Sequence, residues 1–157
     1  MTGAQRPTNA PAPPLADFAG CWHLHRTIRP DGTAPGQMPA RLQGEAVWRP
    51  APRGLVCTES GLLHLPGQAP LRAERRYLWQ DGPDGISVRF GDGRFFHRIP
   101  ASGGPVAHDC PPDRYDGGFD FSGWPDLFRV VWRVHGPRKG YRMDSLYRRP
   151  PGLSPAG

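Results

Sequence analysis

The sequence is poor in cysteine, lysine, glutamate and long apolar runs. Its 157 residues include three cysteines, and Cys21, Cys57 and Cys110 show no Cys-x-x-Cys spacing. That pattern excludes a disulfide framework and a zinc ribbon. No 18 apolar residues follow one another, and residues 1–14 hold no apolar signal region, so neither a membrane span nor a secretory leader is expected. We expect one domain in the reducing cytoplasm.

The basic excess of the chain is almost all arginine. Lys and Arg together number 20 against 14 Asp and Glu, a formal net charge of +6, and only Lys139 is a lysine. Nucleic-acid-binding proteins usually gather basic residues in a patch or stripe. Here the arginines are scattered singly along the chain, and the bias toward arginine over lysine is typical of a GC-rich coding sequence. We therefore expect no nucleic-acid partner.

Glycine and proline, at 21 residues each, are abundant. Many of them lie at the two ends of the chain and between short apolar runs, where they break helices and favour turns. We expect disordered tails over residues 1–14 and 150–157, one domain over residues 15–149, and a single helical turn over residues 15–18.

Apolar and polar side chains alternate with period two through most of the domain, which indicates β-strands. Trp22, Leu24, Arg26 and Ile28 share one face of the first run, and the later runs alternate in the same way. The opposite stripe is rich in arginine, including Arg129 and Arg133, and is expected to face solvent. About 8–10 short strands predict an all-β protein, a single antiparallel β-barrel.

The start of the first run resembles a known signature. Gly20-Cys21-Trp22, just after the expected helical turn, resembles the Gly-x-Trp motif of lipocalins, in the calycin superfamily. The resemblance implies a barrel in which Trp22 closes the base. It also implies that a basic residue near the end of the last strand, Arg148 or Arg149, packs across that tryptophan.

A second resemblance covers most of the chain. The segments Gly91-Asp92-Gly93-Arg94-Phe95-Phe96-His97, His108-Asp109-Cys110 and Gly136-Pro137-Arg138-Lys139 look like a bacterial family of unknown function, over about residues 15–149. That resemblance implies a domain of this family and carries no activity.

Arg75 and Tyr77 lie two residues apart on the face that also holds Trp79. The pair resembles the Arg-x-Tyr carboxylate clamp of fatty-acid-binding proteins. A guanidinium offers paired N–H donors to a carboxylate, and the phenol adds a third donor. The structural alternative is that Arg75 pairs with Glu59 or braces Trp22.

Three further polar residues are candidates for the barrel interior. Arg26 shares the face of Trp22, whereas the facing of Glu59 is ambiguous. If Glu59 points inward, it is either a carboxylate partner of Arg26 or Arg75, or an acid or base with a shifted pKa. His97 shares a face with Phe95 and Ile99, as hydrogen-bonded core or as a ligand donor or general acid.

His108-Asp109-Cys110, followed by Asp113, is the densest cluster of reactive residue types. One His-x-Cys pair, with His97 or Asp113 as a third ligand, is a weak zinc signal, and we expect no metal. A catalytic Cys–His pair and a hydrogen-bonded cluster at the barrel mouth are the other interpretations. Lys139, near a hairpin at a barrel end, is either a point charge for an anion or an ordinary exposed lysine.

These residues support three hypotheses. The first is a binding protein whose apolar interior takes an amphipathic anionic small molecule. Its acid group would be held by Arg75, Tyr77 and Arg26, and the remaining ligand-binding candidates are Glu59, Arg94, Lys139 and Tyr147. The second is a cofactor-free isomerase, cyclase or hydrolase on the same barrel. Its acid or base would be His97 or His108, its proton donor Tyr141 or Tyr147, and its anion stabiliser Lys139 or Arg94. The third is a filled barrel that acts through its surface. No cofactor is expected.

Overall fold

The computed structural model describes residues 10–138 and 140–151, which form ten strands and one short helix. The helix is a 3-10 turn, η1 (Leu15–Phe18), and no helix of the described residues is long and apolar enough to span a membrane. The strands are β1 (Gly20–Pro30), β2 (Ala40–Ala51), β3 (Gly54–His64), β4 (Leu71–Gly82), β5 (Gly85–Phe90), β6 (Phe95–Pro100), β7 (Gly104–Cys110), β8 (Asp113–Asp120), β9 (Leu127–His135) and β10 (Gly140–Arg148).

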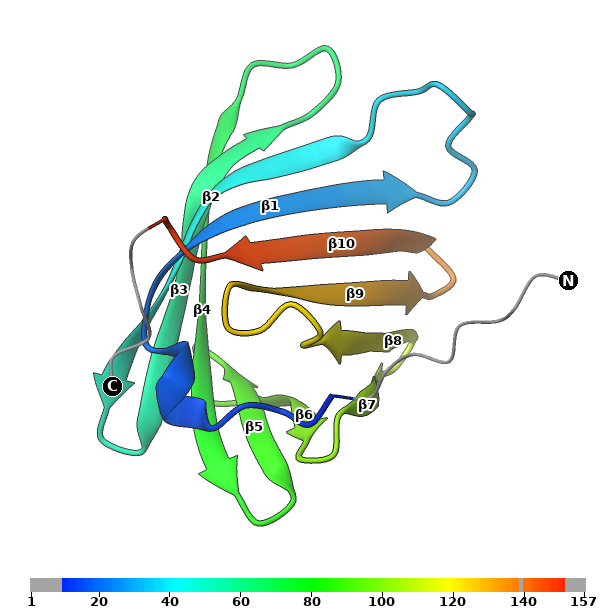
Figure 1. Cartoon of the computed structure of the whole chain (residues 1–157). Coiled ribbons are helices and arrows are strands. Elements are labelled where there is room, and N and C mark those ends of the chain that lie inside the picture. Colours follow the sequence, from blue (N-terminus) through cyan, green and yellow to red (C-terminus); the bar gives the residue numbers. More distant parts are fainter. Residues whose placement is uncertain (1–9, 139, 152–157) are drawn as a thin grey trace, which may run out of the picture.

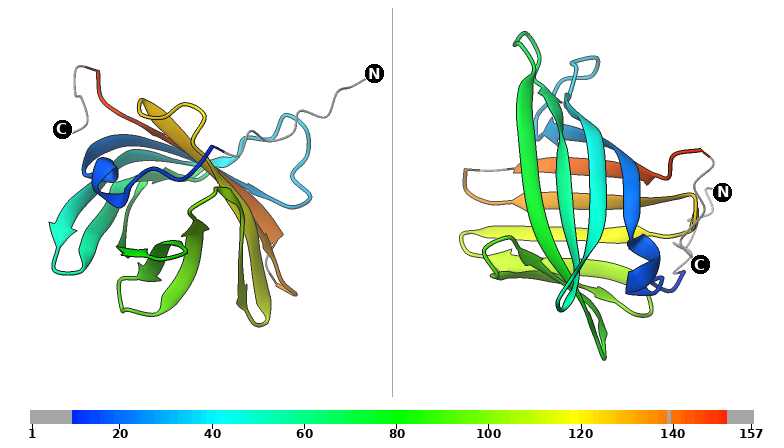
Figure 2. Two further views of the ribbon diagram at one scale, coloured as in Figure 1. Left: turned by 60° about the horizontal axis from the view of Figure 1, so that its bottom comes forward. Right: turned by 90° about the vertical axis from the view of Figure 1, so that its left-hand side faces the viewer.

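All ten strands belong to one antiparallel sheet, in the order β6-β5-β4-β3-β2-β1-β10-β9-β8-β7. The sheet curls until its edge strands, β6 and β7, come near each other, and the result is a nearly closed barrel (Figures 1 and 2). Curling of this kind leaves few exposed strand edges. The single antiparallel barrel predicted from the alternation is confirmed.

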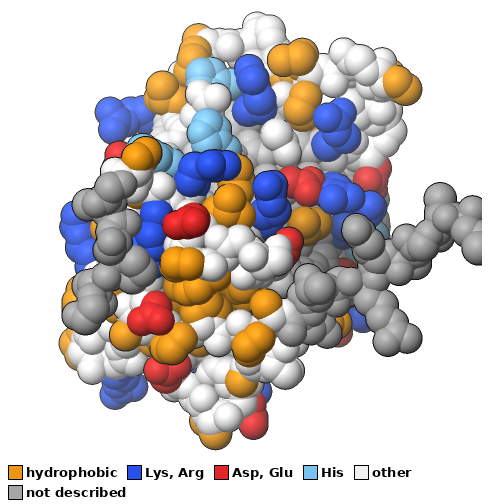
Figure 3. Space-filling view, viewed as in Figure 1, with side chains coloured by type: hydrophobic (Ala, Val, Ile, Leu, Met, Phe, Trp, Pro, Cys, Tyr) orange, Lys and Arg blue, Asp and Glu red, His pale blue; other side chains and the backbone are white. Residues whose placement is uncertain are grey.

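The facing of the strands follows the predicted alternation. Trp22 and Leu24 of β1 are fully buried, whereas Arg129 and Arg133 of β9 are exposed. Figure 3 shows basic side chains spread over the visible face, with acidic ones between them. Inward-facing side chains therefore form the core, and the arginine stripes face water.

One end of the barrel is closed by aromatic packing. The indole Nε1–H of Trp22 donates to Phe18 O at 2.9 Å, and Phe18 is fully buried. The guanidinium of Arg149 lies 4.0 Å from the Trp22 ring centroid and donates to the carbonyl oxygens of Asp17 and, at 3.0 Å, Pro125. The packing of a basic residue across Trp22 is confirmed, and the residue is Arg149 rather than the exposed Arg148.

The alternation fails at the start of β6. Val88 of β5 pairs with His97, but the next residue, Arg89, pairs with Phe95, so Phe96 is an extra residue in a β-bulge. Phe96 and His97 consequently both line the interior, while Phe95 is 45% exposed. The expectation that Phe95 shares the inward face of His97 is wrong for this reason.

Residues 10–14 differ from the disordered tail expected there. Ala12 N–H donates to Ala101 O at 3.1 Å, and Pro13 is buried. The segment therefore lies against the barrel before η1 begins. The other parts of the two expected tails are mostly outside the described residues: these are residues 1–9 and 152–157, whereas residues 150–151 are described.

Candidate functional site

The barrel encloses a cavity of about 180 Å³. Its lining residues come from β1 to β6 and from β8 to β10. In the row of paired residues Leu24, Gly44, Gly61 and Ala73, the two middle positions carry no side chain. A Cβ at Gly44 would lie 1.9 Å from Ser60 O and a Cβ at Gly61 2.3 Å from Gln43 O, so the two glycines mark a close approach of β2 and β3 beside the cavity.

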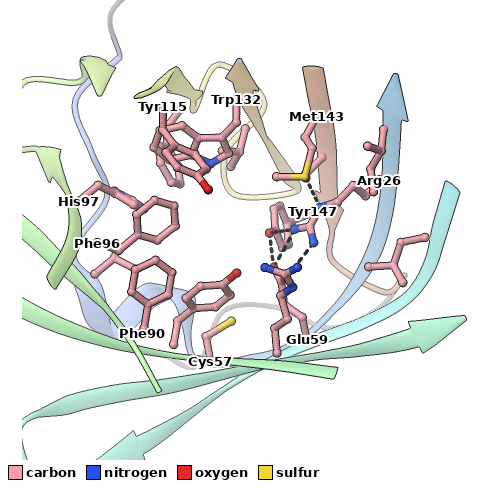
Figure 4. Close-up of a pocket in the computed structure, with 18 of the residues that line it drawn as sticks. Arg26, Cys57, Glu59, Phe90, Phe96, His97, Tyr115, Trp132, Met143 and Tyr147 are labelled. Atoms are coloured by element: carbon pink, nitrogen blue, oxygen red, sulfur yellow. Dashed lines mark hydrogen bonds and ion pairs between the residues drawn. The ribbon is translucent and has the colours of Figure 1, made fainter. Parts of the chain in front are cut away.

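A polar cluster forms one wall of the cavity (Figure 4). Arg26 of β1 and Glu59 of β3 make a bidentate ion pair, with Nη1 3.0 Å from Oε1 and Nη2 3.1 Å from Oε2. Arg26 also donates to Ser145 Oγ at 2.7 Å and to Tyr147 OH at 3.0 Å. Tyr147 OH in turn donates to Oε2 of Glu59. Three strands far apart in sequence are thus joined inside the barrel.

The cluster is a fixed ion pair rather than a free anion site. Burial, the largest single influence, would lower the pKa of Arg26, but the Glu59 carboxylate together with Tyr147 and Tyr77 outweighs burial, so the pKa is raised. Burial, reinforced by the charge of Glu59, raises the pKa of Tyr147 well above its ordinary value. The Arg26 guanidinium is thus occupied by protein partners. This differs from the expectation that Arg26 holds the acid group of a ligand.

Arg75 and Tyr77 of β4 both line the cavity, as the clamp hypothesis requires. Arg75 is exposed, which places it at the opening of the cavity, and Tyr77 is half-buried. Burial and the charge of Glu59 raise the pKa of Tyr77, and the nearby Arg75 opposes that effect. The Cα atoms of Arg75 and Glu59 are paired across the strands, yet Glu59 is ion-paired with Arg26. No described carboxylate forms an ion pair with Arg75.

Aromatic rings form the opposite wall (Figure 4). Phe90 and Phe96 are stacked with their centroids 4.6 Å apart, and Phe96 stacks on Trp132 at 5.3 Å. The β-bulge at Phe96 brings this ring inward between its two neighbours. The cavity therefore has an apolar aromatic wall and a polar wall, as an amphipathic ligand requires.

His97 lies within the aromatic wall. It is 3% exposed and contacts Trp132 at a centroid distance of 5.0 Å. Burial, together with the nearby His108, lowers the pKa of His97 to about 3, so its imidazole is neutral at ordinary pH. Nδ1 of His97 and Nε1 of Trp79 are both buried and find no hydrogen-bond partner in the part of the chain that the structure describes. Most buried polar atoms in proteins have a partner.

His108 is not brought into the cavity lining. It is half-buried on β7, with its ring 5.3 Å from Phe96 and 5.8 Å from Tyr115. Cys110 is exposed. Within residues 10–138 and 140–151, no three His, Cys, Asp or Glu side chains gather as metal ligands do.

The other candidates fall into three groups. Glu59, Tyr141 and Tyr147 line the cavity. Arg94 does not line the cavity: it is exposed in the turn after β5, where its Nε lies 2.7 Å from Asp92 Oδ2. Lys139 lies outside the described residues.

Most of the lining residues were not among the sequence candidates for the site, and Ser145, Trp79, Phe96 and Cys57 are the ones that matter for its chemistry. Ser145 and Trp79 lie on the inward stripes of β10 and β4, where alternation alone does not separate a site residue from core. Phe96 faces the interior only because of the β-bulge, and no local sequence pattern predicts that bulge. Cys57 is buried beside Glu59, and burial raises the pKa of its thiol, which keeps it protonated.

Comparison with known proteins adds a fold and a family. The barrel is similar to the S-type phycobiliprotein lyase CPES from Guillardia theta, with a TM-score of 0.59 and 10% sequence identity over 88% of this chain and 92% of that one. None of the curated proteins matches the chain. A family of unknown function, DUF6314, matches residues 18–149, and the chain belongs to this family.

Proposed function

We propose that this barrel binds a small amphipathic molecule that carries one acid group. The observation that carries the proposal is Arg75, which lines the cavity beside Tyr77 and has no ion-pair partner among the described carboxylates. Of the two lining arginines, Arg26 is neutralised by Glu59, so Arg75 supplies the net positive charge at the opening.

The geometry suits a carboxylate better than a cation or a neutral head group. Arg75 and Tyr77 are two residues apart on one strand, so both side chains point to the same side of the sheet. A guanidinium and a phenol O–H are donors, and charge-assisted hydrogen bonds to a carboxylate are among the stronger ones in proteins. The ligand's acid group would lie at the opening, where Arg75 is exposed.

The apolar part of the ligand would lie against Phe90, Phe96 and Trp132. The cavity, at about 180 Å³, is smaller than the roughly 300 Å³ at which sites for drug-sized ligands begin. We therefore propose a compact ligand, about the size of one ring with a short acidic chain.

Binding fits these residues better than acid–base catalysis. A general acid or base works best with a pKa near the working pH. The pKa of His97 is lowered to about 3, and the pKa values of Tyr77 and Tyr147 are raised. The similar structure is, by its title, a lyase, but a fold alone does not select between binding and catalysis.

The test compares three probes that share an apolar body: 3-phenylpropionate, 3-phenylpropan-1-ol and 3-phenylpropylamine. Titrations are followed by the fluorescence of Trp79 and Trp132 and by amide shifts. We expect the acid to bind at least about tenfold more tightly than the alcohol, since hydrogen bonds to charged groups contribute about 1.5–3 kcal/mol. The amine should bind most weakly.

Arg75→Gln should remove the preference for the acid, and Tyr77→Phe should reduce it. Arg76→Gln is the matched control, because it removes the same charge from the exposed outer face of β4 and should keep the preference. Equal binding of acid and alcohol by the wild-type protein, or an unchanged preference in Arg75→Gln, would refute the proposal.

A further inference from the structure

His97 and Trp79 hold two buried polar atoms that the barrel itself does not satisfy. His97 is 3% exposed and Trp79 5% exposed, and both line the cavity. Neither Nδ1 of His97 nor Nε1 of Trp79 has a hydrogen-bond partner among the described residues. A buried polar atom without a partner is costly, so a site with two of them is suited to a ligand that supplies one.

The two residues lie in one row of the sheet. Trp79 of β4 pairs with Val88 of β5, and Val88 pairs with His97 of β6. Residues paired across neighbouring strands project to the same side, so Trp79 and His97 flank Val88 on the inner face, roughly 10 Å apart at their Cα atoms. Phe119 contacts both, at centroid distances of 5.6 Å from His97 and 6.4 Å from Trp79.

This row lies deeper than the Arg75–Tyr77 pair. Trp79 is the next inward-facing residue of β4 after Tyr77. It lies toward the closed base of the barrel, where its ring centroid is 5.2 Å from that of Phe18 and 5.2 Å from that of Trp48. Arg75 is exposed, whereas Trp79 and His97 are buried. A ligand whose acid group lies at Arg75 therefore extends its other end toward this row.

We propose that His97 and Trp79 form a second polar subsite, which binds an uncharged oxygen, a hydroxyl or carbonyl, at the end of the ligand remote from its acid group. This inference rests on the proposed binding function and names the ligand class more closely. An indole N–H only donates, so the ligand atom must accept a hydrogen bond. A neutral imidazole donates through one nitrogen and accepts through the other, so it serves either a hydroxyl or a carbonyl.

Charge excludes the other ligand groups. The row Trp79–Val88–His97 holds no carboxylate, so a buried cation there would be unpaired. Burial, together with the nearby His108, keeps the His97 imidazole neutral. The row therefore carries no positive charge that would attract a second acid group of the ligand. An uncharged oxygen is the group that the subsite fits.

The experiment adds one hydroxyl to each of two probes. The acid pair is 3-phenylpropionate and 3-(4-hydroxyphenyl)propionate; the neutral pair is 3-phenylpropan-1-ol and 3-(4-hydroxyphenyl)propan-1-ol. We expect the hydroxyl to raise affinity at least about threefold within both pairs, as one net hydrogen bond does. The neutral pair keeps this test separate from the acid-binding proposal, because its gain does not depend on Arg75.

Variants and NMR test whether the affinity gained from the hydroxyl comes from the subsite. His97→Phe and Trp79→Phe should each reduce the ratio between the affinities of the hydroxylated probe and its parent within both pairs. His23→Phe, at an exposed position on the outer face of β1, is the matched control and should keep the effect. If a variant does not fold, imidazole ¹⁵N shifts of His97 in the wild-type protein give the answer without it.

Those shifts should move when a hydroxylated probe is added and stay almost constant with its parent. Equal affinity within both pairs, or ¹⁵N shifts that respond alike to hydroxylated and parent probes, would overturn the subsite and leave the acid-binding proposal standing. If the protein shows no preference for the acid over the alcohol but the added hydroxyl still raises affinity, the acid-binding proposal is refuted and the subsite stands.

Discussion

Arg26 and Glu59 form a bidentate ion pair inside the barrel, with N–O distances of 3.0 and 3.1 Å and side chains only 11% and 5% exposed. Removing one partner of a buried pair leaves an uncompensated charge. We expect Glu59→Leu to lower the free energy of unfolding by about 3–5 kcal/mol in urea denaturation.

The double variant Arg26→Met with Glu59→Leu tests whether the loss comes from the unpaired charge. Replacing both charges by apolar side chains is often nearly neutral, so the double variant should be more stable than Glu59→Leu alone. If the effects of the two substitutions simply add, the ion pair is not the source of the loss.

His97 should make stability depend on pH. An unfolded histidine has a pKa near 6.5, and the folded value is lowered to about 3. Between these pH values the unfolded chain binds a proton that the folded chain does not. The free energy of unfolding should therefore fall as the pH decreases from about 6.5 toward 3, by up to about 1.4 kcal/mol per pH unit from this group.

Urea denaturation at pH 7.5 and pH 5 measures this dependence. His97→Phe, which cannot titrate, should show a smaller loss at pH 5 than the wild-type protein. His23→Gln, at an exposed position, should lose as much as the wild type. A pH dependence that His97→Phe leaves unchanged would mean that His97 is not buried as a neutral group.

Gly61 marks a close approach of β2 and β3. A Cβ at this position would lie 2.3 Å from Gln43 O and 2.8 Å from Gly44 Cα, so the backbone would have to move. We expect Gly61→Ala to lower the free energy of unfolding by about 1–3 kcal/mol. Gly82→Ala is the control: its nearest contact would be 3.4 Å, so its stability should change by less than about 0.5 kcal/mol. Similar losses in both variants would argue against the clash.

Arg149 links the last strand to the closed end of the barrel. It packs on Trp22 and donates to the carbonyl oxygens of Asp17 and Pro125. Arg149→Ala should lower the thermal midpoint and cost about 1–3 kcal/mol, from a cation–π contact and two hydrogen bonds. Arg148→Ala, at an exposed neighbouring position, should have little effect. Equal losses at the two positions would show that the contact with Trp22 contributes nothing specific.

Most of the architecture could be predicted from the sequence. Alternation with period two assigned the inward stripe of β1 and the outward arginines of β9, because a strand projects successive side chains to opposite faces. Gly-x-Trp placed Trp22 at the base and limited its basic partner to Arg148 or Arg149. Local geometry sufficed for these predictions.

The site depended on contacts between distant parts of the chain. Alternation left the facing of Glu59 ambiguous, and only the assembled sheet brought it to Arg26, 33 residues earlier, rather than to its strand neighbour Arg75. The bulge that turns Phe96 inward arises from the pairing of β5 with β6 and has no signal in β6 alone. The sequence by itself determined the strands and most of their inward-facing stripes. The tertiary structure decided the facing of Glu59 and Phe96 and which interior side chains meet, because barrel closure and strand register set distances that no local pattern encodes.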